Sequence, residues 1–328
     1  MKILEQVKNC KRIGISGHEN PDGDCAGSCC GLALYLRKKM PEAQVDIFLE
    51  ELPGSLERCI PGSDTILHEI PSEADRYDAF IVLDSTPERT GGAYALYKKA
   101  ERKINIDHHR TNKGPSDAVT YIDGDASSAC ELVYNVIERE DIDREIAKAL
   151  YVGMVTDTGV FQYSNTSEST MRAAGHLMSF GFDFSALIRE VFFARTFTQA
   201  KILGTALTRA ELLLQGKLIL CVLDKKTLEE VGAERKDLDG ISAQMCLTEG
   251  VDCSVLVHES GSGEWRASFR SANITDVSHT ARLFEGGGHM RASGCTIRTE
   301  AKKGRDLAAC LDILIKDIER QLRDAGAI

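Results

Sequence analysis

The sequence has no long hydrophobic run, and this absence limits where the protein can act. The longest apolar stretches, such as residues 218–223, are far shorter than the ~20 residues that cross a bilayer. The first residues (MKILEQVKNCKR) also lack the apolar segment and small-residue cleavage site of a secretory signal. We therefore expect a cytoplasmic protein that makes no membrane contact.

Regular cysteine spacing is lacking as well. The 11 cysteines are scattered along 328 residues without a Cys-x-x-Cys pair. Neither a disulfide scaffold nor a zinc ribbon is expected from this pattern, and free thiols are its ordinary interpretation. The sequence also shows no internal repeat and no low-complexity segment.

Positive charge is in deficit, since 40 Lys and Arg residues face 50 Asp and Glu residues and the formal net charge is -10. This balance argues against a broad basic face that coats long duplex nucleic acid. It does not exclude an anionic substrate, because bound metal ions and a few arginines can create local positive potential. Small or short anions are therefore favoured.

What is present is a pattern of alternating strands and helices, with 43% hydrophobic residues and length enough for two domains. In the first half, short β-rich runs alternate with helical periodicity, which predicts an α/β domain with a parallel sheet flanked by helices. The expected strands are 13–16, 45–49, 79–83 and 103–106, and the expected helices are 27–39 and 145–155.

The second half has a different character. Residues 184–215 contain no strong helix breaker and predict a helical connector. Strands are then expected at 217–223, 252–258, 265–270 and 295–297, before an amphipathic C-terminal helix that begins near Leu307. We thus divide the chain into an N-terminal domain (1–185), a helical linker (186–210) and a smaller α/β domain (211–328).

Four short segments of the N-terminal half end in acidic or imidazole side chains. They read GHENPDGDCAGS, VLDST, INIDHHRTN and MVTDTGVF. Taken singly, each has an ordinary explanation as a turn, a helix cap or surface decoration. Together they suggest one site, because the carboxyl ends of parallel strands share one sheet edge, where ligands bind. The polar residues involved are His18, Asp22, Asp24, Asp84, Asp107, His108, His109 and Asp157.

Four carboxylates gathered in one crevice repel one another, and two divalent cations would neutralise their charge. These carboxylates belong to Asp22, Asp24, Asp84 and Asp157. Oxygen and imidazole ligands suit Mn²⁺ or Mg²⁺, with Co²⁺, Fe²⁺ or Zn²⁺ also compatible. Two such ions roughly 3.5–4 Å apart can activate a water molecule and hold a phosphate during hydrolysis. The residues therefore predict a two-metal phosphoesterase.

The chain resembles the DHH phosphoesterase family, which is named for the triplet seen here at 107–109. The HxxxPDxD string, the isolated Asp84, the DHH triplet and the TDTG string match that family's motifs in order. Later, FRS at 269–271 and GGGH at 286–289 resemble its associated C-terminal domain. The resemblance covers nearly the whole chain.

This resemblance implies roles for individual residues. His18, Asp22 and Asp84 would hold one metal ion, most often Mn²⁺ in this family. The second ion would be held by Asp24, Asp84, His108 and Asp157, with Asp84 bridging the two. Asp107 would orient the neighbouring histidines, and His109 would contact the scissile phosphate and donate a proton to the leaving oxygen. Asp84, Asp107 and His109 are thus the predicted catalytic residues.

The resemblance also implies a substrate-binding role for the C-terminal domain. An arginine can bind a phosphate bidentately, and a glycine run lets the backbone approach an anion closely. The candidates are Arg270, Ser271, Gly286, Gly287, Gly288, His289 and Arg291. Two residues depart from the family pattern, Glu285 in place of a fourth glycine and Cys25 in place of a small inert residue. Neither is a predicted ligand position.

Compact members of the family resemble bacterial oligoribonucleases that degrade very short RNAs. Many also convert 3′-phosphoadenosine 5′-phosphate to AMP, and some hydrolyse linear dinucleotides. The expected partner is therefore a short RNA or a dinucleotide rather than long duplex nucleic acid, and a homodimer stays open. Two alternatives remain: an exopolyphosphatase, and a non-catalytic nucleotide sensor that retains the fold.

Overall fold

The computed structural model describes residues 1–70, 76–299 and 306–328, which divide into two compact units, 1–194 and 195–328. The division falls inside the segment for which a helical connector was predicted. Within the described residues, no helix combines the length and the apolarity needed to cross a bilayer.

The N-terminal unit is built on a six-stranded sheet in the order β3-β2-β1-β4-β5-β6. The sheet is parallel, as the sequence predicted, but β3 and β6 were not expected. Its strands are β1 (Arg12–Ser16), β2 (Gln44–Phe48), β3 (Ile66–Leu67), β4 (Ala79–Leu83), β5 (Arg102–Asp107) and β6 (Val119–Ile122). Its helices are α1 (Ile3–Gln6), α2 (Gly23–Lys39), α3 (Gly54–Cys59), α4 (Tyr94–Lys99), α5 (Ala129–Val136), α6 (Arg144–Asp157), α7 (Glu168–Met178) and α8 (Phe184–Ile188).

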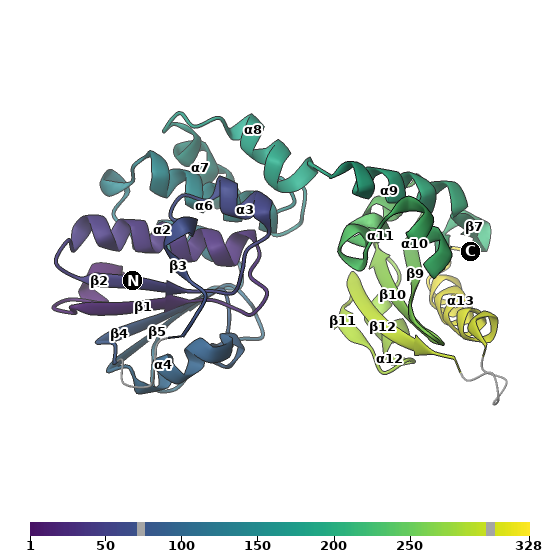
Figure 1. The fold of residues 1–328 in the computed structure, drawn as a ribbon, viewed down its shortest axis with the longest axis horizontal. Coiled ribbons are helices and arrows are strands. Elements are labelled where there is room, and N and C mark those ends of the chain that lie inside the picture. Colours follow the sequence, from purple (N-terminus) through teal and green to yellow (C-terminus); the bar gives the residue numbers. More distant parts are fainter. Residues whose placement is uncertain (71–75, 300–305) are drawn as a thin grey trace. The chain divides into compact units, whose positions relative to one another are not determined.

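The strand order places a topological switch point between β1 and β4. After β1 the chain passes through α2 to β2 on one side, and after β4 it passes through α4 to β5 on the other. Figure 1 shows α2 and α6 on one face of this sheet and α4 on the opposite face. A crevice forms at the carboxyl ends of two strands whose connections diverge in this way.

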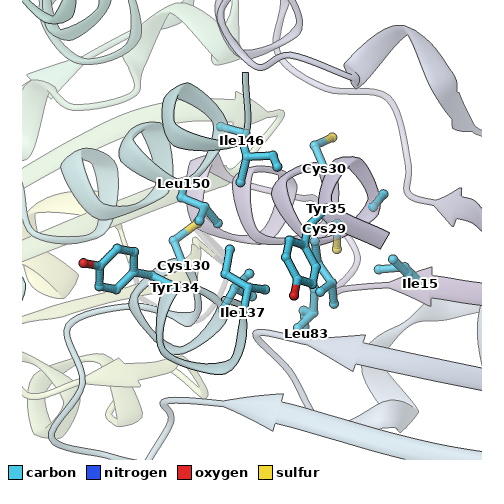
Figure 2. Packing of buried hydrophobic residues seen from close by; sticks show 14 of the residues in the cluster. Ile15, Cys29, Cys30, Tyr35, Leu83, Cys130, Tyr134, Ile137, Ile146 and Leu150 are labelled. Atoms are coloured by element: carbon cyan, nitrogen blue, oxygen red, sulfur yellow. The ribbon is translucent and has the colours of Figure 1, made fainter. Parts of the chain in front are cut away.

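The core beneath this crevice is formed by α2, which packs against α5 and α6 (Figure 2). Cys29 and Cys30 of α2, Cys130 of α5 and Leu150 of α6 are fully buried there. Helix α2 begins four residues earlier than predicted, at Gly23, because the Asp22 side chain caps it by accepting from the backbone N–H groups of Asp24 and Cys25.

The C-terminal unit is a smaller mixed sheet in the order β11-β12-β10-β9-β8-β7, in which only β8 and β9 pair in parallel. The strands are β7 (Glu211–Leu213), β8 (Leu218–Leu223), β9 (Cys253–Gly261), β10 (Glu264–Ser271), β11 (Gly287–His289) and β12 (Ala292–Arg298). The helices are α9 (Phe197–Arg209), α10 (Lys225–Val231), α11 (Ile241–Cys246), α12 (Val277–Arg282) and α13 (Leu307–Asp324).

Helices cover both faces of this second sheet. Apolar side chains of α9 and α11 pack with Ile219 and Leu256, whereas those of α12 and α13 pack with Leu218 and Val255. Figure 1 shows the same division, with α9, α10 and α11 on one side and α12 and α13 on the other. The predicted smaller α/β domain, with strands followed by an amphipathic C-terminal helix, is therefore confirmed.

The predicted helical connector over 184–215 is formed by separate helical pieces, and the prediction is wrong at its C-terminal end. Helix α8 continues as a π-helical turn (Arg189–Phe193), the chain is extended at Ala194, and α9 begins at Phe197 with Thr196 as its capping residue. Residues 211–213 then form β7, because their backbone groups pair with those of β8. Pairing with a distant strand decides this segment, and no local sequence signal reports it.

Candidate metal centre

The loop after β1 carries the first group of polar side chains. His18 Nδ1 lies 2.9 Å from the carbonyl oxygen of Glu19, so it donates a hydrogen bond there and leaves the lone pair of Nε2 free. That Nε2 lies 3.3 Å from Asp84 Oδ2 and 3.8 Å from Asp22 Oδ1. His18 is thus held in the tautomer that can bind a metal ion through Nε2.

Asp84 lies at the centre of the site, directly after β4. Its backbone is left-handed (φ 57°), which is uncommon for any residue but glycine, and its N–H donates to the Ile106 carbonyl of β5 at 3.0 Å. Only 2% of Asp84 is exposed, yet Oδ1 has no hydrogen-bond partner among the described residues. A buried carboxylate oxygen without a donor is a rare and costly arrangement unless a cation binds it.

The two oxygens of Asp84 face different histidines. Oδ2 faces His18, and Oδ1 lies 3.3 Å from His108 Nε2. His108 Nε2 is also 3.9 Å from Asp24 Oδ2 and 3.8 Å from Asp157 Oδ2. One carboxylate therefore joins two groups of ligand atoms, one around each histidine.

Hydrogen bonds from α5 and from an asparagine hold two carboxylates of the second group, Asp24 and Asp157. Asp24 is buried, and its carboxylate accepts from the N–H groups of Ala129 (2.6 Å) and Cys130 (2.9 Å) in the first turn of α5. Asp157 ends α6, where Asn165 Nδ2 donates to its carboxylate at 3.3 Å. The amides at the helix N-terminus orient Asp24 and favour its negative charge.

The shifted pKa values of these residues reflect an excess of negative charge in the site. Burial, followed by the carboxylates of Asp84 and Asp157, raises the pKa of Asp24 well above its usual value. Burial is also the main cause that raises the pKa of Asp157 to about 6. Burial opposes protonation of His108, but the carboxylates of Asp84, Asp24 and Asp157 outweigh it and raise its pKa to about 10. Divalent cations bound by the same atoms would relieve this excess.

The donor set also fits hard or borderline divalent cations. Ligand atoms of Asp24, His108 and Asp157 all lie within 4.8 Å of one another, as do those of His18, Cys25 and Asp84. Oxygen and imidazole nitrogen dominate both groups, which suits Mn²⁺, Mg²⁺, Co²⁺ or Fe²⁺. The thiol of Cys25, a buried residue of α2, belongs to the group that contains His18 and Asp84.

Asp107 and His109 form a hydrogen-bonded pair that borders this centre, since His109 Nδ1 lies 3.6 Å from Asp84 Oδ1. Asp107 Oδ1 accepts from the backbone N–H of His109 at 3.1 Å and from its Nδ1 at 2.7 Å. The hydrogen bond to Asp107 is the main cause that raises the pKa of His109, whose side chain is 42% exposed. A histidine held in this way keeps a proton on Nδ1 and presents Nε2 to its surroundings.

A buried polar network behind Asp107 was not foreseen from the sequence. Asn112 Nδ2 donates to Asp107 Oδ2 (2.6 Å) and to Asn105 Oδ1 (2.9 Å). Asn105 in turn donates to the carbonyl oxygens of Val82 and Ser85, on either side of Asp84. The asparagine between two buried isoleucines of the strand KINI was the available signal, since a buried polar residue needs partners.

Glu131 is a second residue that the sequence did not single out. It is 2% exposed, and its carboxylate accepts from Ser127, Ser169 and Thr170. Burial alone would raise its pKa, but these donors outweigh burial and lower it. Glu131 thereby ties the start of α5, which holds Asp24, to the start of α7.

The predicted substrate-binding residues lie in the C-terminal unit, around β10, β11 and β12. Arg270 of β10 pairs with Ala292 of β12, which pairs with His289 of β11. These residues form one row across three strands and so share a face of the sheet. Arg291 Nη1 donates to Ser271 Oγ at 3.2 Å. Gly287 and Gly288 lie within β11, and Gly286 directly precedes it.

Glu285, which replaces a family glycine, has a left-handed backbone with φ 56°. Glycine adopts that conformation without cost, whereas other residues pay about 1–2 kcal/mol for it. Glu285 therefore carries a backbone conformation that glycine would adopt without this cost. The six predicted metal ligands converge in one unit, and the seven predicted substrate contacts gather in the other.

Comparison with known protein families agrees with this organisation. Residues 12–154 match the DHH family, N-terminal domain, and residues 215–322 match the DHHA1 domain. The chain belongs to the DHH family.

Individual relatives of this DHH-family chain extend over nearly its full length. It is 28% identical over 324 residues to the bifunctional oligoribonuclease and PAP phosphatase NrnA of Bacillus subtilis, which covers 97% of this chain and 99% of the relative. An exopolyphosphatase-related protein from Bacteroides fragilis superposes with a TM-score of 0.84 at 24% identity, covering 97% of this chain and 94% of that chain. RecJ from Thermus thermophilus, solved in complex with Mn²⁺, shares the fold with a TM-score of 0.54 at 14% identity, covering 97% of this chain and 53% of that one.

Proposed function

We propose that this DHH-family chain is a phosphoesterase that uses two divalent metal ions, most often Mn²⁺. Its substrates would be short oligoribonucleotides or linear dinucleotides, hydrolysed to mononucleotides, and 3′-phosphoadenosine 5′-phosphate, hydrolysed to AMP. The relative from Bacillus subtilis, which is named for both activities, supports this choice of substrates.

The observation that carries the proposal is the position of Asp84. Its Oδ2 faces the group formed by His18 and Asp22, and its unpartnered Oδ1 faces the group formed by His108, Asp24 and Asp157. A buried carboxylate that contributes one oxygen to each of two ligand groups is suited to bridge two cations. Bound there, two divalent cations would polarise a phosphate and increase the acidity of a water molecule.

The chain's own residues would orient the ligands, transfer a proton and bind the substrate. The Glu19 carbonyl fixes the His18 ring, and the α5 amides fix Asp24, so the ligands are oriented before substrate arrives. His109 would keep a proton on Nδ1, where Asp107 stabilises it, and would deliver the Nε2 proton to the leaving oxygen of the phosphate ester. In the C-terminal unit, Arg270 and His289 share a row from which they can bind a substrate phosphate.

Polyphosphate is the competing substrate, because it offers a similar anion without a base. The exopolyphosphatase-related protein from Bacteroides fragilis has the same fold, but at its level of identity that likeness concerns the fold alone. The decisive assay compares Mn²⁺-dependent release from polyphosphate, a diribonucleotide, a pentaribonucleotide and 3′-phosphoadenosine 5′-phosphate. Preferential release from polyphosphate would contradict the proposed substrate.

Asp84→Ala is expected to reduce hydrolysis of the preferred substrate by at least about a hundredfold, because both ligand groups lose a member. Asp84→Asn, which keeps the shape of the side chain, is the second variant and replaces Asp84→Ala if that protein fails to fold. Asp117→Ala is the matched control, since Asp117 is 60% exposed and forms only a surface ion pair with Lys103. Full activity in the Asp84 variants would refute the proposal.

Metal binding gives a readout independent of turnover. The wild-type chain, stripped of metal and titrated with Mn²⁺ in a calorimeter, is expected to bind two ions. Saturating Mn²⁺ at about a hundred times Kd should raise Tm by about 5–10 °C, a shift that Asp84→Asn should lose. A wild-type chain that binds no Mn²⁺ and shows no thermal shift would contradict the metal assignment even if activity were present.

A further inference from the structure

A cavity of about 540 Å³ lies entirely within the C-terminal unit, and of the seven predicted substrate residues only Gly286 lines it. Strands β9, β10 and β12 form its floor. A short 3₁₀ helix (Arg235–Leu238) forms one wall, and residues 284–286 contribute to another. This volume is typical of pockets that bind small organic ligands such as a nucleotide.

The cavity is lined by three arginines, two of which lack a carboxylate partner among the described residues. Arg298 Nε lies 3.7 Å from Glu264 Oε2. No hydrogen bond or ion pair to the side chains of Arg235 or Arg266 is found within residues 1–70, 76–299 and 306–328. These two guanidinium groups are therefore available to bind an anion, and their planar geometry suits a phosphate.

A buried histidine lies on the floor beside Arg266. His258 of β9 pairs with Arg266 of β10, and His258 is only 6% exposed. Neither of its ring nitrogens has a hydrogen-bond partner among the described residues. Burial, followed by the charges of Arg235 and Arg266, lowers its pKa to about 4. The ring is thus neutral near pH 7, with one nitrogen able to donate and the other to accept, so a ligand in the cavity could supply partners for it.

The rest of the lining favours a nucleotide over a simple anion. Phe284, Leu238 and Leu256 contribute apolar surface that can contact a base. Asp239 and Glu285 also line the cavity and can accept hydrogen bonds from sugar hydroxyls or base amino groups. Phosphate alone would offer these carboxylates no donor, whereas a nucleoside would.

The register of the sheet relates this cavity to the row that contains Arg270. His258, Arg266 and Thr296 form one row, and Arg270, Ala292 and His289 form another on the same face, two rows further along. Arg270 lies four positions after Arg266 along β10, which corresponds to roughly 13 Å between their backbones. Two phosphates on one ribose lie closer together than this. The row between them contains Ser268 and Gly294, so small side chains leave the path open on β10 and β12.

We propose that the cavity binds the phosphate and nucleoside of an oligonucleotide more than one nucleotide away from the phosphate held at Arg270. Occupation of the cavity would then favour RNAs of three or more nucleotides over 3′-phosphoadenosine 5′-phosphate, which is too short to reach both rows. This inference rests on the proposed function and adds to it a residue-level basis for substrate length.

The test compares kcat/KM for the triribonucleotide pApApA with kcat/KM for 3′-phosphoadenosine 5′-phosphate. In Arg266→Gln the ratio should fall by about tenfold or more, mainly through KM for pApApA, because a charged hydrogen bond to phosphate is lost. Arg235→Gln, at an exposed position of the wall, should shift the ratio in the same direction and serves if Arg266→Gln folds poorly. Arg323→Gln is the control, because Arg323 pairs with Glu319 within α13 on the opposite face of the sheet.

Binding to the metal-stripped full-length chain separates this proposal from the proposed function. Wild-type protein should bind pApApA more tightly than 3′-phosphoadenosine 5′-phosphate in a calorimeter, and Arg266→Gln should abolish the difference. A wild-type chain that hydrolyses neither substrate contradicts the proposed function, while the binding comparison still tests the cavity. A ratio left unchanged in both arginine variants, or an equal loss on both substrates, would refute the cavity proposal.

Discussion

Asp107 Oδ1 accepts a hydrogen bond of 2.7 Å from Nδ1 of His109, two residues further along the chain. The carboxylate is almost fully buried and is held from behind by Asn112, whereas the His109 side chain is 42% exposed. One end of the imidazole is therefore anchored by a fixed negative charge while the other is free to meet a substrate. This geometry suits transfer of a proton from Nε2.

Asp107→Asn is expected to lower kcat through this proton transfer. The amide oxygen can still accept from Nδ1, but the charge that supports a protonated His109 is gone. Hydrolysis of a dinucleotide, whose ribose leaving group needs a proton, should slow by about a hundredfold. A p-nitrophenyl nucleotide ester, whose leaving group needs none, should slow by less than about tenfold. Equal losses on both esters in steady-state assays would show that Asp107 acts on ligand geometry and not through His109.

The residues proposed as metal ligands could be located from the sequence for a physical reason. Apolar strands such as 79–83 are short and fully buried, so the polar residue that follows each strand is easy to locate. In a parallel sheet, residues at equivalent strand ends meet at one edge. Asp84, His108 and the loop with His18 and Asp22 follow this rule, and the structure brings them together.

The residues that support the ligands could not be found in this way. Asp24 is held by amides of α5, more than a hundred residues away in sequence, and Asn105 reaches the carbonyl groups on either side of Asp84. Strand β11 was not expected either, because three glycines in succession suggest a turn, and only pairing with β12 makes them a strand. Such partners depend on the assembled fold and not on local pattern.

Glu131→Gln is expected to destabilise the N-terminal unit. The amide group turns a donor toward groups that already donate, and one buried hydrogen bond is lost, at a cost of about 1–3 kcal/mol at pH 7. Glu168→Gln is the control, since Glu168 is 80% exposed and pairs only with Arg172 at the surface; its effect should stay within about 0.5 kcal/mol. Urea unfolding monitored by circular dichroism measures both changes.

The effect of Glu131→Gln should also depend on pH in a defined direction. The folded protein lowers the pKa of Glu131 below its unfolded value of about 4.3. The carboxylate therefore contributes its full stability above about pH 4.3, and this contribution is lost as pH falls through the lower, folded pKa. The difference between wild type and variant in free energy of unfolding should be largest at neutral pH and shrink below about pH 4. A difference that grows on acidification would contradict the assigned role.

Gly153→Ala tests how closely α6 must approach the metal centre. A Cβ atom at this position would lie 2.2 Å from Cys130 Sγ and 2.7 Å from Asp24 Oδ1, so α6 or Asp24 must move. Although alanine favours a helix by about 1 kcal/mol, the variant should be destabilised by about 1–3 kcal/mol. Its affinity for Mn²⁺ should fall by about tenfold or more, because Asp24 no longer holds its place.

Gly175→Ala in α7 is the matched control, since a Cβ atom at that position would have open space. This variant should stabilise the chain by about 0.5–1 kcal/mol. Its affinity for Mn²⁺, measured by calorimetric titration, should be unchanged. Equal Mn²⁺ affinity in the two variants would show that contact between α6 and Asp24 does not position the ligands.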